Sequence, residues 1–199
     1  MKTVFFDVDT QIDFLYPAGA LAVPGGDAIV ENLGALTRFA ASKRLQVLST
    51  ADAHVEDDPE FRTWKPHCVI GTAGQMKATV TTLPKPVTLS TAEGALDWIA
   101  DQVGAPGQII IEKHQIDCFT NPNLRPLLDL LQADRYVVYG LVSEFCVQFA
   151  AFGLLQTGAR IELVTDAVRG LSDREEDEML QRFVAQGGVL TTTAQIIAE

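Results

Sequence analysis

The fold is decided by the stretch Val137-Val138-Tyr139-Gly140-Leu141-Val142-Ser143-Glu144-Phe145-Cys146-Val147-Gln148-Phe149-Ala150-Ala151. An apolar, β-branched run ends at Gly140, and an apolar helix begins near Glu144, which places Cys146 in its first turn. Ligands of parallel α/β sheets bind at the carboxyl ends of the strands, and helix starts favour negative charge. We therefore expect the Cys146 thiol to ionise more readily than a free thiol, whose pKa is about 8.5. The alternative is a small hydrophobic residue packed in a buried helix.

Composition narrows the classes of protein. The chain has 199 residues, 47% hydrophobic and 21% charged, which indicates one globular domain over residues 1–199. Lys and Arg number 15 against 26 Asp and Glu, and the net charge of −11 argues against nucleic acid or an anionic membrane as partner. The three cysteines lack metal-ligand spacing and are odd in number, so a disulfide framework is not expected. Residues 1–7 are too short an apolar run for a signal peptide, and we expect a cytoplasmic location.

Alternating apolar runs and helical patterns predict the architecture. Strands are expected at residues 3–8, 45–50, 108–112, 136–139, 160–164 and 189–192, with helices between them. Ser172 with Glu175, and likewise Ser90 with Glu93, has the spacing of a capping box that opens a helix. The pattern predicts a three-layer α/β/α fold with a mostly parallel sheet of about six strands.

Three reactive groups fall at the carboxyl ends of predicted strands. Asp9, Lys113 and Cys146 supply a carboxylate, an ammonium and a thiol, which are the groups that acyl transfer needs. Taken singly, Asp9 is also a common turn former and Lys113 a common solvated strand end. Their joint placement at the ligand-binding edge favours a catalytic triad.

Two motifs resemble a known family. Residues 9–14 resemble the D-x-Q-x-D-F opening of the isochorismatase-like cysteine hydrolases, and residues 140–147 resemble their nucleophile turn. The resemblance implies that Asp9 is the general base, Lys113 the third triad member and Cys146 the nucleophile.

The same resemblance implies a detail of the nucleophile turn. A cis peptide bond is expected before Val142, and the backbone N–H groups of Val142 and Cys146 would form the oxyanion hole. Ser143-Glu144-Phe145 departs from the commoner Thr-Asp-Tyr or Thr-Asp-His of the family, which affects the wall of the pocket.

The loop after residue 50 carries candidate metal ligands. Asp52, His54, Glu60 and His67 offer two imidazoles and two carboxylates, which suit zinc, manganese or iron. Exposed loop polars are the alternative. The loop resembles that of the nicotinamidase branch, which implies a divalent metal, zinc before manganese or iron, held by these four residues. Phe14 and Trp64 match the aromatic pair that holds the substrate ring in that branch, or else they are loop-packing hydrophobes.

The expected function is that of a cysteine-dependent nicotinamidase, with a small-molecule amide as substrate and a homo-oligomeric assembly implied by the resemblance. Residues 114–123 and a long insertion at 84–104 depart from well-known bacterial nicotinamidases, so another amide, a ureide or isochorismate stays open as substrate. A haloacid-dehalogenase-like phosphatase is a remote alternative because residues 5–10 resemble its D-x-D start, although Gln11 does not fit. The third alternative is a binding domain without catalytic activity.

Overall fold

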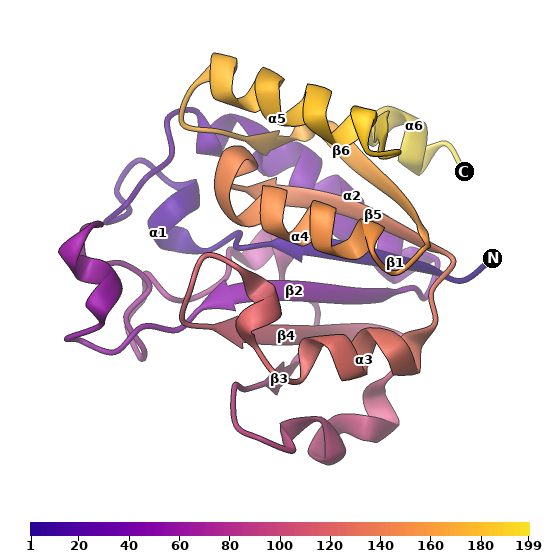
Figure 1. Ribbon diagram of the computed structural model, residues 1–199, viewed down its shortest axis with the longest axis horizontal. Helices are drawn as coiled ribbons and strands as arrows, with labels where there is room; N and C mark the ends of the chain where they lie inside the picture. The colour runs from indigo at the N-terminus through magenta and orange to yellow at the C-terminus, as the bar shows by residue number, and fades with distance from the viewer.

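The computed structural model describes residues 1–199 and contains one parallel sheet of seven strands, in the order β3-β4-β2-β1-β5-β6-β7 (Figure 1). The strands are β1 (Thr3–Val8), β2 (Gln46–Asp52), β3 (Val87–Leu89), β4 (Gly107–Lys113), β5 (Arg135–Leu141), β6 (Arg160–Arg169) and β7 (Val189–Thr191). The helices are α1 (Ile12–Leu15), α2 (Val30–Ser42), α3 (Leu124–Leu131), α4 (Gln148–Leu155), α5 (Asp173–Ala185) and α6 (Thr193–Ile197). None of them combines the length and apolar character that crossing a bilayer requires.

Alternation along β1 divides the core into two layers. Val4, Phe6 and Val8 pack in a cluster with buried residues of α3, α4 and α5, whereas Phe5 packs in a second cluster with those of α2 and α6. Successive side chains of a strand point to opposite faces, so a sheet covered on both sides must be apolar throughout. The predicted three-layer α/β/α fold is confirmed.

The strand count exceeds the prediction by one, because β3 lies in the 84–104 insertion as an edge strand beside β4. The prediction of a capping box at Ser90 and Glu93 is wrong. A 3-10 helical segment, Ala95–Gln102, begins instead after Gly94, which has a φ of 74°. The Asn123 side-chain amide donates to the carbonyls of Ser90 and Ala92, at 3.0 and 2.8 Å. These bonds tie the backbone of residues 90–92 to the start of α3, and tertiary contact overrides the local pattern.

Close packing of β1 against β5 explains one glycine. Gly140 has a φ of 122°, and a Cβ there would lie 2.0 Å from the carbonyl oxygen of Val8. Only glycine allows the two strands to approach so closely at the point where the chain turns toward Cys146.

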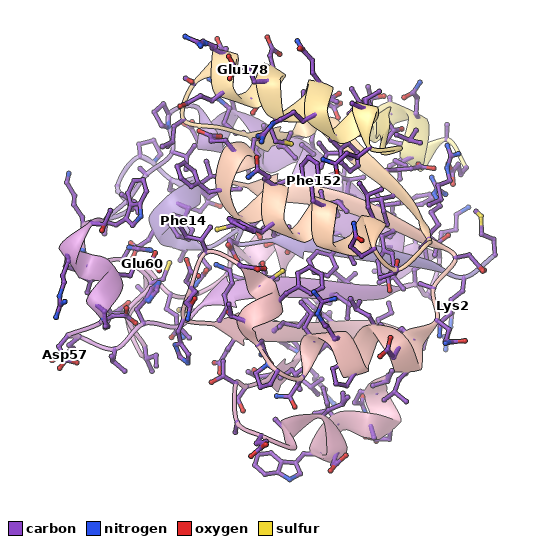
Figure 2. The ribbon with its side chains drawn as sticks, viewed as in Figure 1. Lys2, Phe14, Asp57, Glu60, Phe152 and Glu178 are labelled. Carbon is purple, nitrogen blue, oxygen red and sulfur yellow. The ribbon has the colours of Figure 1, made fainter.

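The parallel strands deliver their ends to one edge. Both chain termini lie at the amino ends of the strands, with the long loop after β2 at the opposite side (Figure 1). Figure 2 shows Phe14 and Glu60 at that carboxyl edge and Lys2 at the far one. Loops at this edge are where such sheets bind ligands.

Candidate active site

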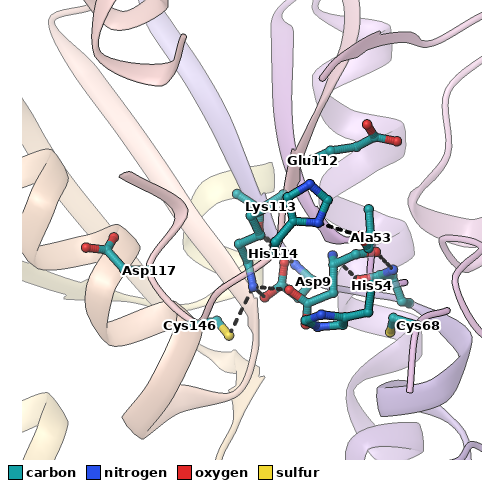
Figure 3. Close-up of polar contacts among 12 residues, drawn as sticks. Asp9, Ala53, His54, Cys68, Glu112, Lys113, His114, Asp117 and Cys146 are labelled. Carbon is teal, nitrogen blue, oxygen red and sulfur yellow. Dashed lines mark hydrogen bonds and ion pairs between the residues drawn. The ribbon is translucent and has the colours of Figure 1, made fainter. Parts of the chain in front are cut away.

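Three strand ends bring Asp9, Lys113 and Cys146 together, as Figure 3 shows. Asp9 follows β1 with a φ of 47°, a conformation that aspartate tolerates better than most residues. Lys113 is the last residue of β4, and Cys146 lies in the π-helical turn Ser143–Val147 between β5 and α4. All three are buried, and Cys146 retains 7% of its exposure.

Lys113 is the centre of the cluster. Its Nζ lies 3.0 Å from Asp9 Oδ2 and 3.5 Å from Cys146 Sγ, and it also donates to Asp52 Oδ1. The other oxygen of Asp9, Oδ1, accepts a hydrogen bond from the Thr50 hydroxyl at 2.6 Å. Asp9 Oδ2 has no hydrogen-bond partner in spite of the nearby ammonium. Asp9 Oδ2 is thus ion-paired with Lys113 but accepts no hydrogen bond, and it can accept a proton.

Burial and charge act together on the ionisation of this cluster. Burial lowers the pKa of Lys113, but the carboxylates of Asp52 and Asp9 outweigh it and raise that pKa well above its ordinary value. Burial raises the pKa of Asp9, although Lys113 lowers it. Lys113 consequently stays charged, and Asp9 is a stronger proton acceptor than an exposed aspartate.

The predicted easy ionisation of the Cys146 thiol is wrong. Burial raises the pKa of Cys146 well above that of a free thiol, and the nearby carboxylates of Asp9 and Asp52 add to the rise while Lys113 opposes it. Sequence reasoning counted the helix start and one ammonium, but it did not see the second carboxylate. A thiol in this setting needs a base at the moment of attack, and Asp9 is next to it.

The nucleophile turn has the backbone geometry that the resemblance implied. The peptide bond between Leu141 and Val142 is cis. The carbonyl of Val142 accepts hydrogen bonds from the N–H groups of Phe145 and Val147. Val142 and Cys146 both line the cavity described below, so a substrate oxygen held there lies beside the turn that carries their N–H groups.

Three of the predicted metal ligands form a compact set. One donor atom each from Asp52, His54 and His67 lies within 4.8 Å of the others. Asp52 Oδ2 is 3.8 Å from Nε2 of His54 and 3.7 Å from Nε2 of His67. Two imidazoles and a carboxylate suit zinc and other divalent transition metals.

The orientation of both imidazoles fits a metal. The Nδ1 atom of His54 pairs with Asp58 at 3.0 Å, and Nδ1 of His67 pairs with the Lys65 carbonyl at 2.7 Å. Such contacts place the proton on Nδ1 and direct the Nε2 lone pair inward. Nε2 of His54 is buried without a hydrogen-bond partner, an arrangement that a bound cation would satisfy.

The charge around His54 also favours a cation. Although burial lowers the pKa of His54, the neighbouring carboxylates of Asp52 and Asp58 raise it to about 9. The negative potential that attracts a proton attracts a divalent ion equally well, and ion binding displaces the proton.

Glu60 lies at the margin of the set. Its Oε1 is 3.9 Å from Nε2 of His67, and burial raises its pKa. The remaining histidine of the chain, His114, points elsewhere: its Nδ1 contacts the Ala53 carbonyl at 2.6 Å and its Nε2 the Thr91 hydroxyl at 3.1 Å.

One cavity is lined both by the Cys146 thiol and by residues of the metal set. Its lining is mainly apolar and comprises Phe14, Leu21, Ala22, Val23, Asp52, Glu60, Trp64, His67, Ile116, Leu141, Val142, Phe145, Cys146 and Leu171. The two predicted ring-binding aromatics, Phe14 and Trp64, are both in this lining. The Phe14 ring lies 5.2 Å from that of His67, and Trp64 meets Phe145 edge-on at 5.4 Å between centroids.

Sequence reasoning missed several residues of the site. Asp58, which orients His54, stands four positions after it, a spacing that hints at such a pair only when the loop conformation is known. Leu21, Ile116 and Leu171 reach the cavity from three separate loops, and nothing in their local sequence marks them.

Comparison with known proteins agrees with this geometry. The isochorismatase domain model matches residues 3–195. The nicotinamidase of Escherichia coli is 28% identical over 203 residues, covering 94% of this chain and 93% of that protein, and the nicotinamidase/pyrazinamidase of Mycobacterium tuberculosis is 27% identical, covering 83% and 85%. The crystal structure of Pyrococcus horikoshii pyrazinamidase in complex with zinc aligns with a TM-score of 0.79 and 26% identity, covering 96% of this chain and 99% of that one. The chain belongs to the isochorismatase family.

Proposed function

We propose that this chain is a nicotinamidase, which hydrolyses nicotinamide to nicotinic acid and ammonia through a thioester on Cys146. Family membership and the similar nicotinamidases make it a hydrolase of amide C–N bonds. The choice of amide is the proposed part. The observation that carries it is one apolar cavity with a thiol cluster on one side and an Asp-His-His set on the other.

The lining of the cavity disfavours the alternative substrates. None of its residues is lysine or arginine, so the carboxylate of isochorismate or of an acidic ureide would find no cationic side chain on the wall. An uncharged aromatic amide suits this wall, because flat apolar rings are favoured there and charged groups lose hydration.

The phosphatase alternative has no support in the geometry. Asp7, the first carboxylate of the D-x-D pattern, is fully buried and pairs with Lys77 at 3.0 Å. It does not line the cavity. A nucleophilic role for Asp7 therefore lacks access to a substrate.

The reaction begins at the cluster around Lys113. Asp9 Oδ2 takes the thiol proton while Cys146 Sγ attacks the carboxamide carbon, and the N–H groups of Val142 and Cys146 stabilise the oxyanion. Asp9 then passes this proton to the carboxamide nitrogen, which leaves as ammonia when the C–N bond breaks. The same carboxylate activates a water that hydrolyses the thioester, and Lys113 keeps its charge throughout and holds Asp9 and Cys146 in place.

The other side of the cavity holds the ring. Phe14 and Trp64 would contact its faces, and Asp52, His54, Glu60 and His67 would hold a divalent ion, with zinc the first choice. Such an ion, when bound, supplies a Lewis acid for the ring nitrogen.

Ammonia release from nicotinamide, measured with and without a chelator, tests this proposal. We expect release by the metal-loaded protein and a strong decrease after chelation, with benzamide, which lacks the ring nitrogen, hydrolysed more slowly. A chelator-insensitive protein that hydrolyses benzamide as well as nicotinamide would contradict the ring-binding part. If the protein hydrolysed a ureide or isochorismate in preference to nicotinamide, the proposal that nicotinamide is the substrate would be wrong.

A further inference from the structure

Two polar residues of the D-x-Q-x-D-F motif, Gln11 before α1 and Asp13 within it, have no role in the mechanism. Gln11 is completely buried, and its side-chain amide forms hydrogen bonds with both the N–H and the carbonyl of Asp52. The Asp52 N–H donates to Gln11 Oε1 at 2.7 Å, and Gln11 Nε2 donates to the Asp52 carbonyl at 2.9 Å. The same Nε2 donates to the Gln75 carbonyl at 2.7 Å. Gln11 thus fixes the backbone of a candidate metal ligand.

Asp13 fixes the other end of the candidate metal set. Its Oδ2 accepts the N–H of Cys68, the residue after His67, at 2.7 Å, and its Oδ1 accepts the N–H of Ala20 at 2.9 Å. A Cβ at Gly74 would lie 2.1 Å from Asp13 Oδ2, so the loop backbone is pressed against this carboxylate. A buried carboxylate that binds backbone N–H groups holds the chain rigidly.

We propose that Gln11 and Asp13 are positioning residues that set the affinity for the divalent ion, by fixing the backbones that carry Asp52 and His67. This inference rests on the proposed metal role of those two ligands. Neither Gln11 nor Asp13 reaches the cavity lining, so both act through the ligands. Partners outside the coordination sphere commonly change metal affinity about 10–100-fold when they are mutated.

The chain offers a matched control at the opposite end of β2. Gln46 is also buried and also binds backbone through both ends of its amide: Nε2 donates to the Gln102 carbonyl at 2.8 Å, and Oε1 accepts the Gly104 N–H at 2.6 Å. Its position at the amino end of the strand is remote from the metal set. A variant of Gln46 therefore loses equivalent hydrogen bonds without touching the ligands.

The experiment is a competitive Zn²⁺ titration against a chromophoric chelator, with the shift of the melting temperature by Zn²⁺ as a second readout. We expect Gln11→Met and Asp13→Asn to bind Zn²⁺ about 10–100-fold more weakly than the wild type and to gain less melting temperature from it. Gln46→Met should stay within about twofold of the wild type, because it is distant from the ligands. Asp13→Asn preserves size and decides the question if Gln11→Met does not fold.

Wild-type affinity in Asp13→Asn, or an equal loss in Gln46→Met, would overturn the inference. Its failure differs from failure of the proposed function. Wild-type protein that binds no Zn²⁺ would refute the metal role and the inference together. Wild-type protein that binds Zn²⁺ and hydrolyses nicotinamide, beside variants that bind equally well, would refute the inference alone.

Discussion

The chain buries two lysine ion pairs, and the groups around each ammonium differ. Lys77 Nζ lies 3.0 Å from Asp7 Oδ2 and donates to the Thr50 carbonyl at 3.3 Å, and the same Asp7 oxygen accepts the Ser49 hydroxyl at 3.1 Å. Lys113 instead contacts two carboxylates and a thiol. Thr50 serves both regions, since its hydroxyl donates to Asp9 and its carbonyl accepts from Lys77.

The comparison shows which features separate the proposed catalytic lysine, Lys113, from the structural one, Lys77. Burial and ion pairing are common to Lys77 and Lys113, so neither property separates structure from function. Each pair also has one carboxylate oxygen without a hydrogen-bond partner, in Asp7 and in Asp9. The distinguishing features are the Cys146 thiol and the cavity that Cys146 lines. A buried pair without such neighbours serves the fold.

The largest expected effect comes from removing the thiol that only the Lys113 cluster has. Cys146→Ala should lower ammonia release by on the order of 10⁴-fold or more, because no nucleophile remains. Melting by circular dichroism should show a folded protein. Cys118→Ala is the control, since this buried thiol lies in the core and outside the cavity lining. Comparable ammonia release by the two variants would show that Cys146 is not the nucleophile.

The next effect separates the two lysines directly. Lys113→Met should lower kcat/KM by roughly 10²–10⁴-fold, since Asp9 and Cys146 lose the charge between them. Both variants leave buried carboxylates unpaired and should be less stable, by about 3–5 kcal/mol in urea unfolding for Lys77→Met. Lys77→Met should nevertheless keep a near-normal kcat where it is folded.

If Lys77→Met does not fold, the double variant Asp7→Leu with Lys77→Met takes its place. This double variant removes the whole buried pair and leaves no unpaired charge. Low kcat in this folded double variant would show that the Lys77 pair, too, serves catalysis.

A third test compares two of the three histidines, one inside the metal set and one outside it. His67→Ala should weaken Zn²⁺ binding by at least about 100-fold, as expected for loss of a ligand rather than of its supporting partner. His114→Ala should bind Zn²⁺ normally, since His114 contacts Ala53 and Thr91. Metal content by elemental analysis checks both variants. Retained metal in His67→Ala would remove this residue from the set.

The smallest effect is a displacement of the pH profile. Burial raises the pKa of Asp9 even though Lys113 lowers it, so the acid limb of kcat/KM should lie above the ordinary aspartate value of about 3.9. Activity falls below that limb because protonated Asp9 cannot accept the thiol proton. Circular dichroism at each pH controls for acid unfolding. A limb at or below the ordinary value would argue against Asp9 as the base.

Sequence predicted those features that depend on local pattern or strand order. Asp9, Lys113 and Cys146 could be placed together because parallel strands deliver their ends to one edge. Ser172 and Ser90 show the limit of such reasoning. Both precede a glutamate by three residues, yet only Ser172 caps a helix, accepting the Glu175 N–H at 3.3 Å. Around Ser90, Asn123 binds the backbone carbonyls instead, a long-range contact that no local pattern contains.

The pKa of the Cys146 thiol could not be predicted from the sequence either. The pKa of Cys146 depends on burial and on Asp52, which lies 94 positions earlier and shares Lys113 with Asp9. The hydrogen bond from the Gln11 side chain to the Asp52 carbonyl was equally unpredictable, because it joins residues 41 positions apart. Such effects follow from packing in three dimensions, and composition or spacing does not encode them.

The most direct test of the thioester on Cys146 is partitioning with hydroxylamine during nicotinamide hydrolysis. An acyl-enzyme predicts that wild-type protein forms nicotinohydroxamic acid at the expense of nicotinic acid as hydroxylamine increases, and that Cys146→Ala forms neither product. Nicotinic acid as the sole product at every hydroxylamine concentration, with ammonia still released, would contradict the account.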